Sequence, residues 1–153
     1  MEKTSTLNPI NKLTNLCAQR TVRTDRLHAA VRTLTDALET AGCRPGQISV
    51  TVDGWTLSYH NLRSNVGVRD CWSFERGDED CCTDLALEVG LDGYLHGDFN
   101  QPIAGPTRAH LIAFGTRAEK FVAAIGERLE TSIARLEAAE IGVNAALAAL
   151  PKD

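Results

Sequence analysis

The chain has 153 residues and a mass of 16.6 kDa, enough for one domain with its own core but too little for two domains of ordinary size. Hydrophobic residues make up 43% of the chain and charged residues 24%, which excludes a disordered or collagen-like protein. The apolar runs are far shorter than the roughly 20 residues of a membrane-spanning helix. The first residues contain no apolar segment of the kind that directs secretion. We therefore expect a cytoplasmic protein that does not bind a membrane.

Charge is distributed unevenly along the chain. Residues 1–47 carry seven basic and four acidic side chains, residues 48–105 carry three and ten, and residues 106–153 carry six of each. An acidic middle third would repel nucleic-acid phosphates, so we do not expect nucleic-acid binding. Arg20, Arg23 and Arg26 lie on one helical ridge and could contact phosphate, but a solvated basic face is the favoured interpretation.

Residues 1–8 are expected to form a flexible tail that precedes a single domain at 9–153, and helices are predicted for residues 9–41. Asn8-Pro9 resembles a helix start, with a capping residue before a proline in the first turn. Thr24 could cap a second helix, so one bent helix and two separate helices are both open. Gly42 follows the last turn, where a left-handed residue is favoured. The apolar positions recur at helical spacing, and they are Ile10, Leu13, Leu16, Cys17, Leu27, Val31, Leu34 and Leu38.

A β-hairpin is predicted for residues 48–59. Apolar and polar residues alternate on both sides of Asp53-Gly54, and Asp-Gly favours a two-residue turn because both turn positions need a positive φ. Such a turn sets the pairing of the strands and places all six alternating apolar residues on one face. The predicted pairs are Val52 with Trp55, Val50 with Leu57, and Ile48 with Tyr59.

Further strands are predicted up to residue 96, which gives a sheet over 48–96. Val66, Val68, Trp72 and Phe74 share one parity, and residues 85–91 alternate between apolar and polar. A second turn at Asp92-Gly93 would lead into a short strand at residues 94–96. We expect a four- to five-stranded antiparallel meander, followed by a turn-rich link at residues 97–105.

A long amphipathic helix is predicted for residues 117–150, with Thr116 and Glu119 forming a capping box at its start. Gly126 and Gly142 are possible breaks, because glycine costs about 1 kcal/mol relative to alanine in a helix. The expected fold class is therefore α+β: N-terminal helices, an antiparallel meander and a long C-terminal helix.

The C-terminal helix has more apolar surface than one face of a sheet can cover. Its charged residues three apart have like charge, as Glu137 and Glu140 do, so packing must stabilise it. The N-terminal helices could cover the second face, or a second copy of the chain or another protein could do so. We expect a homodimer, whose predicted interface consists of Leu129, Ile133, Leu136, Val143, Leu147 and Leu150.

No motif of known chemistry is present, so we expect neither catalysis, nor a metal, nor a cofactor. The five cysteines are expected to be reduced thiols, and they lack Cys-x-x-Cys or His-x-x-x-His spacing. A small cysteine- or metal-dependent enzyme remains the alternative. It would use ligands or a nucleophile drawn from Cys71, Cys81, Cys82, His96 and Asp98.

The acidic segment Asp78-Glu79-Asp80, with Asp84 beyond it, is a predicted binding patch for a protein with a basic surface. It lacks the glycine and the final glutamate of a calcium loop. The expected function is a non-enzymatic, acidic protein-binding module: a homodimeric adaptor, or a small inhibitor that blocks a site on a larger complex. Phage-encoded inhibitors such as anti-CRISPR proteins, and secretion chaperones as the alternative, share its size, acidity and amphipathic helix, but no motif links the chain to either.

Overall fold

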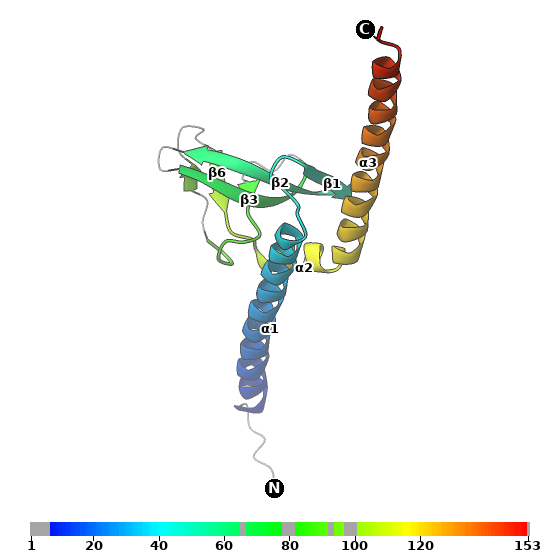
Figure 1. The fold of residues 1–153 in the computed structure, drawn as a ribbon. Coiled ribbons are helices and arrows are strands. Elements are labelled where there is room, and N and C mark those ends of the chain that lie inside the picture. The colour runs from blue at the N-terminus through cyan, green and yellow to red at the C-terminus, as the bar shows by residue number, and fades with distance from the viewer. Residues whose placement is uncertain (1–6, 65–66, 78–81, 92–93, 97–100, 153) are drawn as a thin grey trace.

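The structure is a computed structural model that describes residues 7–64, 67–77, 82–91, 94–96 and 101–152. The chain is α+β, with two long helices that project from a small mixed body (Figure 1). Helix α1 (Leu7–Thr40) and helix α3 (Ala118–Ala148) point away from the body in opposite directions, so the first turn of α1 and the last turn of α3 lie far apart.

Helix α1 is one continuous helix, so the open choice between one helix and two is settled in favour of one. Thr24 does not cap a second helix. Its hydroxyl donates to the carbonyl of Arg20 at 2.7 Å, which satisfies the hydroxyl without ending the helix. The predicted end is confirmed: Gly42 has a φ of 111°, and the N–H of Cys43 donates to the carbonyl of Leu38.

The first sheet contains β1 (Ile48–Val52), β2 (Trp55–Ser64) and β3 (Gly67–Arg76) in that order, all antiparallel. The predicted hairpin and its register are confirmed, because Val52 pairs with Trp55 and the other two predicted pairs follow. Asp53 and Gly54 both have positive φ, as a two-residue turn of this kind requires.

The second sheet contains β4 (Cys82–Thr83), β5 (Tyr94–His96) and β6 (Gln101–Ala104), in the order β4-β6-β5. Strand β6 runs parallel to β4 and antiparallel to β5. Within the described residues the strands therefore divide into two sheets of three, and a single meander of four or five strands is not confirmed. Part of the expected turn-rich link at 97–105 is strand β6.

The strand predicted for residues 85–91 is wrong. The carboxylate of Asp84 accepts a hydrogen bond from the N–H of Ala86 at 3.0 Å, which bends the chain into a turn at the end of β4. Gly105 then packs so closely on this turn that a Cβ there would lie 1.8 Å from the carbonyl oxygen of Glu88. The alternating apolar residues of this segment therefore lie in a turn and not in a strand, and Leu85 is buried in the core.

Helix α2 (Arg108–Gly115) was not anticipated as a separate element, and the capping box predicted at Thr116 is wrong. The capping box belongs to α2: the hydroxyl of Thr107 accepts from the N–H of His110, and His110 accepts from the N–H of Thr107. Thr116 instead donates to the carbonyl of Ile112 at the end of α2. Helix α3 begins one residue after Arg117, without a side-chain cap, and passes through Gly126 and Gly142 unbroken.

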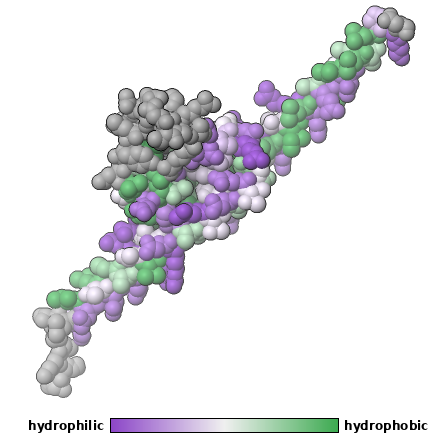
Figure 2. Space-filling model, turned by 60° about the vertical axis from the view of Figure 1, so that its left-hand side comes forward, coloured by the Kyte–Doolittle hydropathy of each residue, from purple (hydrophilic) through white to green (hydrophobic). Residues whose placement is uncertain are grey.

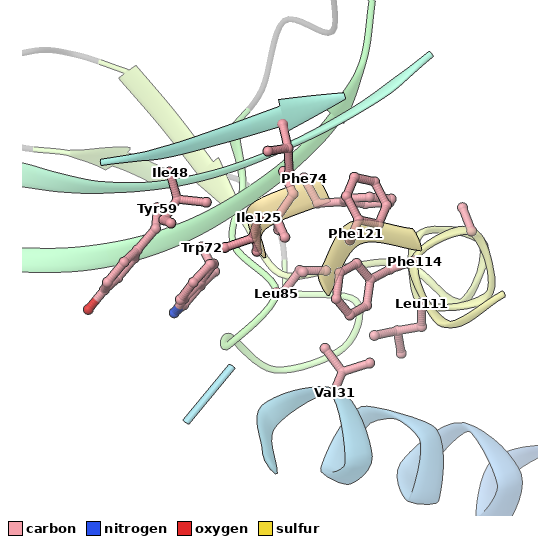
Figure 3. Packing of buried hydrophobic residues seen from close by; sticks show 13 residues of the cluster. Val31, Ile48, Tyr59, Trp72, Phe74, Leu85, Leu111, Phe114, Phe121 and Ile125 are labelled. Carbon is pink, nitrogen blue, oxygen red and sulfur yellow. The ribbon is translucent and has the colours of Figure 1, made fainter. Parts of the chain in front are cut away.

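The core lies where the first sheet meets the inner parts of the three helices (Figure 3). Phe74 of β3 stacks on Trp55 at 4.8 Å and meets Phe114 and Phe121 edge-on. Val31 is the buried residue that α1 contributes to this cluster, and Ile125 is the last buried residue of α3. Only the C-terminal part of α1 and the first turns of α3 are thus covered by the body.

Candidate protein-binding surface

The candidate site is the part of the chain that extends from the body beyond the first turns of α3. We call residues 129–150 the C-terminal arm. Every residue from Glu127 to Lys152 is exposed. The helical part of the arm, residues 129–148, has a length of about 30 Å at 1.5 Å per residue.

The root of the arm is held by several contacts to the first sheet. Phe121 and Ile125 are buried in the core. The guanidinium of Arg128 donates to the carbonyl of Ser49 at 2.9 Å, and that of Arg117 pairs with Asp53 at 3.1 Å. Because β1 is the edge strand of its sheet, Arg128 also occupies a backbone acceptor at an otherwise open edge. The direction in which the arm leaves the body is therefore set by the core and by this edge.

The six residues predicted from the sequence as a dimer interface lie along the arm and are exposed. Their spacings of three, four and seven residues put them in one stripe, in line with the apolar face that packs on the sheet at the root. Figure 2 shows this hydrophobic stripe beside a hydrophilic edge. The exposed fractions are 42% for Leu129, 53% for Ile133, 66% for Leu136, and 59% each for Val143, Leu147 and Leu150.

A groove of about 1100 Å³ lies where the arm leaves β1. Ser49 and Thr51 of the edge strand line one side of it, and Leu129, Ser132 and Leu136 of α3 line the other. The groove lies at the root of the stripe, and its lining is mixed, with Leu129 and Leu136 among polar side chains.

The N-terminal helix does not cover the second face of α3, which was one of the two explanations considered for its apolar surface. Helix α1 leaves the body on the side opposite to the arm (Figure 1). The stripe of the C-terminal arm is therefore uncovered within the described part of the chain.

Of the four acidic residues predicted as a partner-binding patch, the structure describes Asp84. Asp78, Glu79 and Asp80 lie outside the described residues. Asp84 is fully buried, and its carboxylate holds the turn after β4. It therefore supports the fold of this region and adds no charge to the surface of the isolated chain.

The residues of the alternative enzyme do not form a described site. Cys71 is buried in a small cluster with Ile103, while Cys81 and Asp98 lie outside the described residues. Among the residues that the structure describes, no group of three or more His, Cys, Asp or Glu side chains is placed to hold a metal ion. Cys17 and Cys43 carry free thiols, and burial raises the pKa of the Cys43 thiol, which favours its protonated form.

Glu39, Tyr59, Asp70 and Trp72 form a polar cluster between α1 and the first sheet, which no pattern in the sequence predicted. The indole of Trp72 donates to the carboxylate of Glu39 at 2.9 Å, and Trp72 stacks on Tyr59 at 4.1 Å. The Tyr59 hydroxyl donates to Asp70 at 3.3 Å. Burial raises the pKa of Tyr59, and the carboxylates of Glu39 and Asp70 raise it further. The bond from Trp72 to Glu39 therefore ties α1 to the sheet, while the protonated phenol of Tyr59 links β2 to β3.

Comparisons with protein families, curated proteins and solved structures find no match to this chain. In the described part of the chain, no helix is both long enough and apolar enough to cross a bilayer. The interpretation of function therefore depends on the geometry of the molecule itself.

Proposed function

We propose that this chain is a non-enzymatic protein-binding module that self-associates through the C-terminal arm. The observation that carries the proposal is the exposed apolar stripe, six large side chains long, on a helix whose residues are all exposed along the arm. An isolated helix of this length is marginally stable in water. Each large apolar side chain that becomes buried contributes about 1.5–3 kcal/mol. Association would therefore stabilise the arm and remove the stripe from water.

The partner on this stripe is a second copy of the chain, and the dimer serves as an adaptor or inhibitor on a larger complex. The acidic middle third, with three basic and ten acidic residues, favours a target with a basic surface. Asp78, Glu79 and Asp80 are the predicted contacts to that target. Reversing all three to lysine should weaken association with the target and reduce its salt dependence, while the dimer itself is unchanged.

The test of self-association is the mass of the full chain in solution, measured by sedimentation velocity across a concentration series. Leu136→Glu should shift the mass toward one chain, because it places a charge in the middle of the buried stripe. Ala138→Glu is the matched control: it adds the same charge two residues away, on the opposite side of the same helix. The proposal fails if the unmodified chain is monomeric throughout, or if both variants behave alike.

A further inference from the structure

The N-terminal half of α1 forms a second uncovered arm. Residues 8–23, which we call the N-terminal arm, are all exposed, with Ile10 at 57% and Leu13 at 60%. One face of the same helix is covered from Thr24 onward, where Thr24, Val31 and Thr35 are buried against the body. As in α3, a stripe that packs on the body at one end of the helix continues uncovered at the other end.

The stripes of the two arms have the same spacing when the helices are read in opposite directions. From its free end, the N-terminal stripe advances by three, four and three residues up to Arg20. The C-terminal stripe, read from its free end with Glu140 included, advances by the same steps. Two antiparallel helices with equal spacing can therefore bring these four positions of each arm opposite each other. The resulting pairs are Ile10 with Leu150, Leu13 with Leu147, Cys17 with Val143, and Arg20 with Glu140.

Each stripe contains one charged residue, and the two charges are opposite. Arg20 and Glu140 fall opposite each other in the register set by the apolar residues alone. Within the described part of the chain, neither of them forms an ion pair. The arms as a whole also differ in sign: residues 8–23 carry three basic and no acidic side chains, and residues 129–150 carry one basic and three acidic.

Pairing of two C-terminal arms with each other is disfavoured by the same residue. In a parallel pair, Glu140 would face Glu140 of the second copy within the stripe. In an antiparallel pair with Leu129 opposite Leu150, the two Glu140 side chains would again meet near the middle. Like charges at such positions destabilise a helix pair, whereas a single polar pair sets register and partner.

The opposite directions of the arms allow both pairings to form at once. In one copy the two arms leave the body in opposite directions (Figure 1). A two-fold axis perpendicular to the arms therefore places the C-terminal arm of one copy beside the N-terminal arm of the other. The hydrophobic stripes of both arms are visible from one side of the molecule (Figure 2). Such an interface is self-complementary and closes at two copies, so it does not extend into a filament.

The surface area of the chain is large enough for this arrangement. The accessible surface is 10546 Å², whereas a compact monomer of this mass exposes about 7,600 Å². A stable interface removes roughly 800 Å² per partner. The excess of the extended chain over a compact one is several times that amount.

We propose that two copies form a two-fold dimer in which the N-terminal arm of each lies antiparallel along the C-terminal arm of the other, with Arg20 facing Glu140. This inference depends on the proposed self-association, and it adds the segment that covers the outer part of the stripe, at Val143, Leu147 and Leu150. It also predicts that each dimer contains two Arg20–Glu140 contacts.

Cross-linking of the native thiol tests the register directly. Val143→Cys, treated with a short bismaleimide, should give a covalent dimer on denaturing gels, because Cys17 lies opposite position 143. The unmodified chain measures the background of its other cysteines. Ala138→Cys, on the other side of the helix, should add nothing to that background. The combined change Cys17→Ser and Val143→Cys should also abolish the product.

Charge exchange gives an independent test. Arg20→Glu and Glu140→Arg should each weaken dimerisation about tenfold or more, because two pairs are broken per dimer. The two changes combined should restore most of the loss. A chain that is dimeric but insensitive to Arg20→Glu, or that still cross-links at position 143 without Cys17, overturns this inference and leaves self-association intact. A chain that is monomeric at every concentration overturns both.

Discussion

The body and the arms use the same kind of helix with opposite outcomes. In the body, the apolar stripes of α1 and α3 end in a cluster of aromatic and aliphatic side chains, with Phe121 and Val31 almost completely buried. In the arms, stripes of the same spacing remain in water. Periodicity alone therefore does not decide burial. The position of the body along each helix decides which turns of the stripe find a partner within the chain.

The largest effect that separates the two regions is expected from truncating one large side chain in each. Phe121→Ala should lower the free energy of unfolding by about 3–5 kcal/mol, because it leaves a cavity beside the rings of Phe74 and Phe114. Leu136→Ala should change it by less than about 0.5 kcal/mol in the monomer, since the side chain is already exposed. Urea denaturation at concentrations too low for association measures both. Equal losses would contradict the division into body and arm.

The same small substitution should have opposite signs in the two regions. Gly105→Ala should destabilise the body by about 1–3 kcal/mol or more, because its Cβ would meet the carbonyl of Glu88 at 1.8 Å. The measurement is the urea midpoint of the variant relative to the unmodified chain. Gly90→Ala is the control for backbone strain, because Gly90 has a positive φ and open space around it. An alanine there should strain the backbone without colliding with a neighbouring atom.

Gly142→Ala is the counterpart of that substitution in the C-terminal arm. No atom lies within 4 Å of the Cβ position, and the residue is on the side of the helix away from the stripe. Alanine should stabilise the helix by about 1 kcal/mol without touching the interface. Circular dichroism should show greater thermal stability of the helix, and the dimer dissociation constant should fall slightly. A large loss of association would show that this side of the helix also binds.

The sequence was sufficient to predict those elements that depend on neighbouring residues. Asp53-Gly54 determines a turn whose register extends along both strands, and the unbroken period of residues 118–148 determines a helix. The turn after Asp84 could not be predicted in the same way, because the alternation of residues 85–91 also fits a strand and the close packing of Gly105 on Glu88 is distant in the sequence. Helix α2 was missed because His110 occupies the capping position where glutamate or glutamine is the usual signal.

The candidate surface was partly predictable for a different reason. An excess of apolar residues in the C-terminal helix indicated that one sheet face could not cover it, and the six predicted residues are exposed along the arm. The sequence of the N-terminal arm contains no such excess of apolar residues, because its apolar stripe is narrow and its other faces are polar. Only the placement of the body shows that the first half of α1 is uncovered as well.

The smallest expected effect concerns the contact between α1 and the sheet at high pH. The raised pKa of Tyr59 means that the folded state holds the phenol proton more tightly than the unfolded state. This contribution to stability is fully present below pH 10, about the pKa of an unperturbed tyrosine, and decreases as the pH rises above it. Tyr59→Phe has no proton to lose at this position. The urea midpoint of the unmodified chain should therefore fall more steeply between pH 8 and pH 11 than that of the variant. Parallel slopes would mean that Glu39 and Asp70 do not act on the hydroxyl.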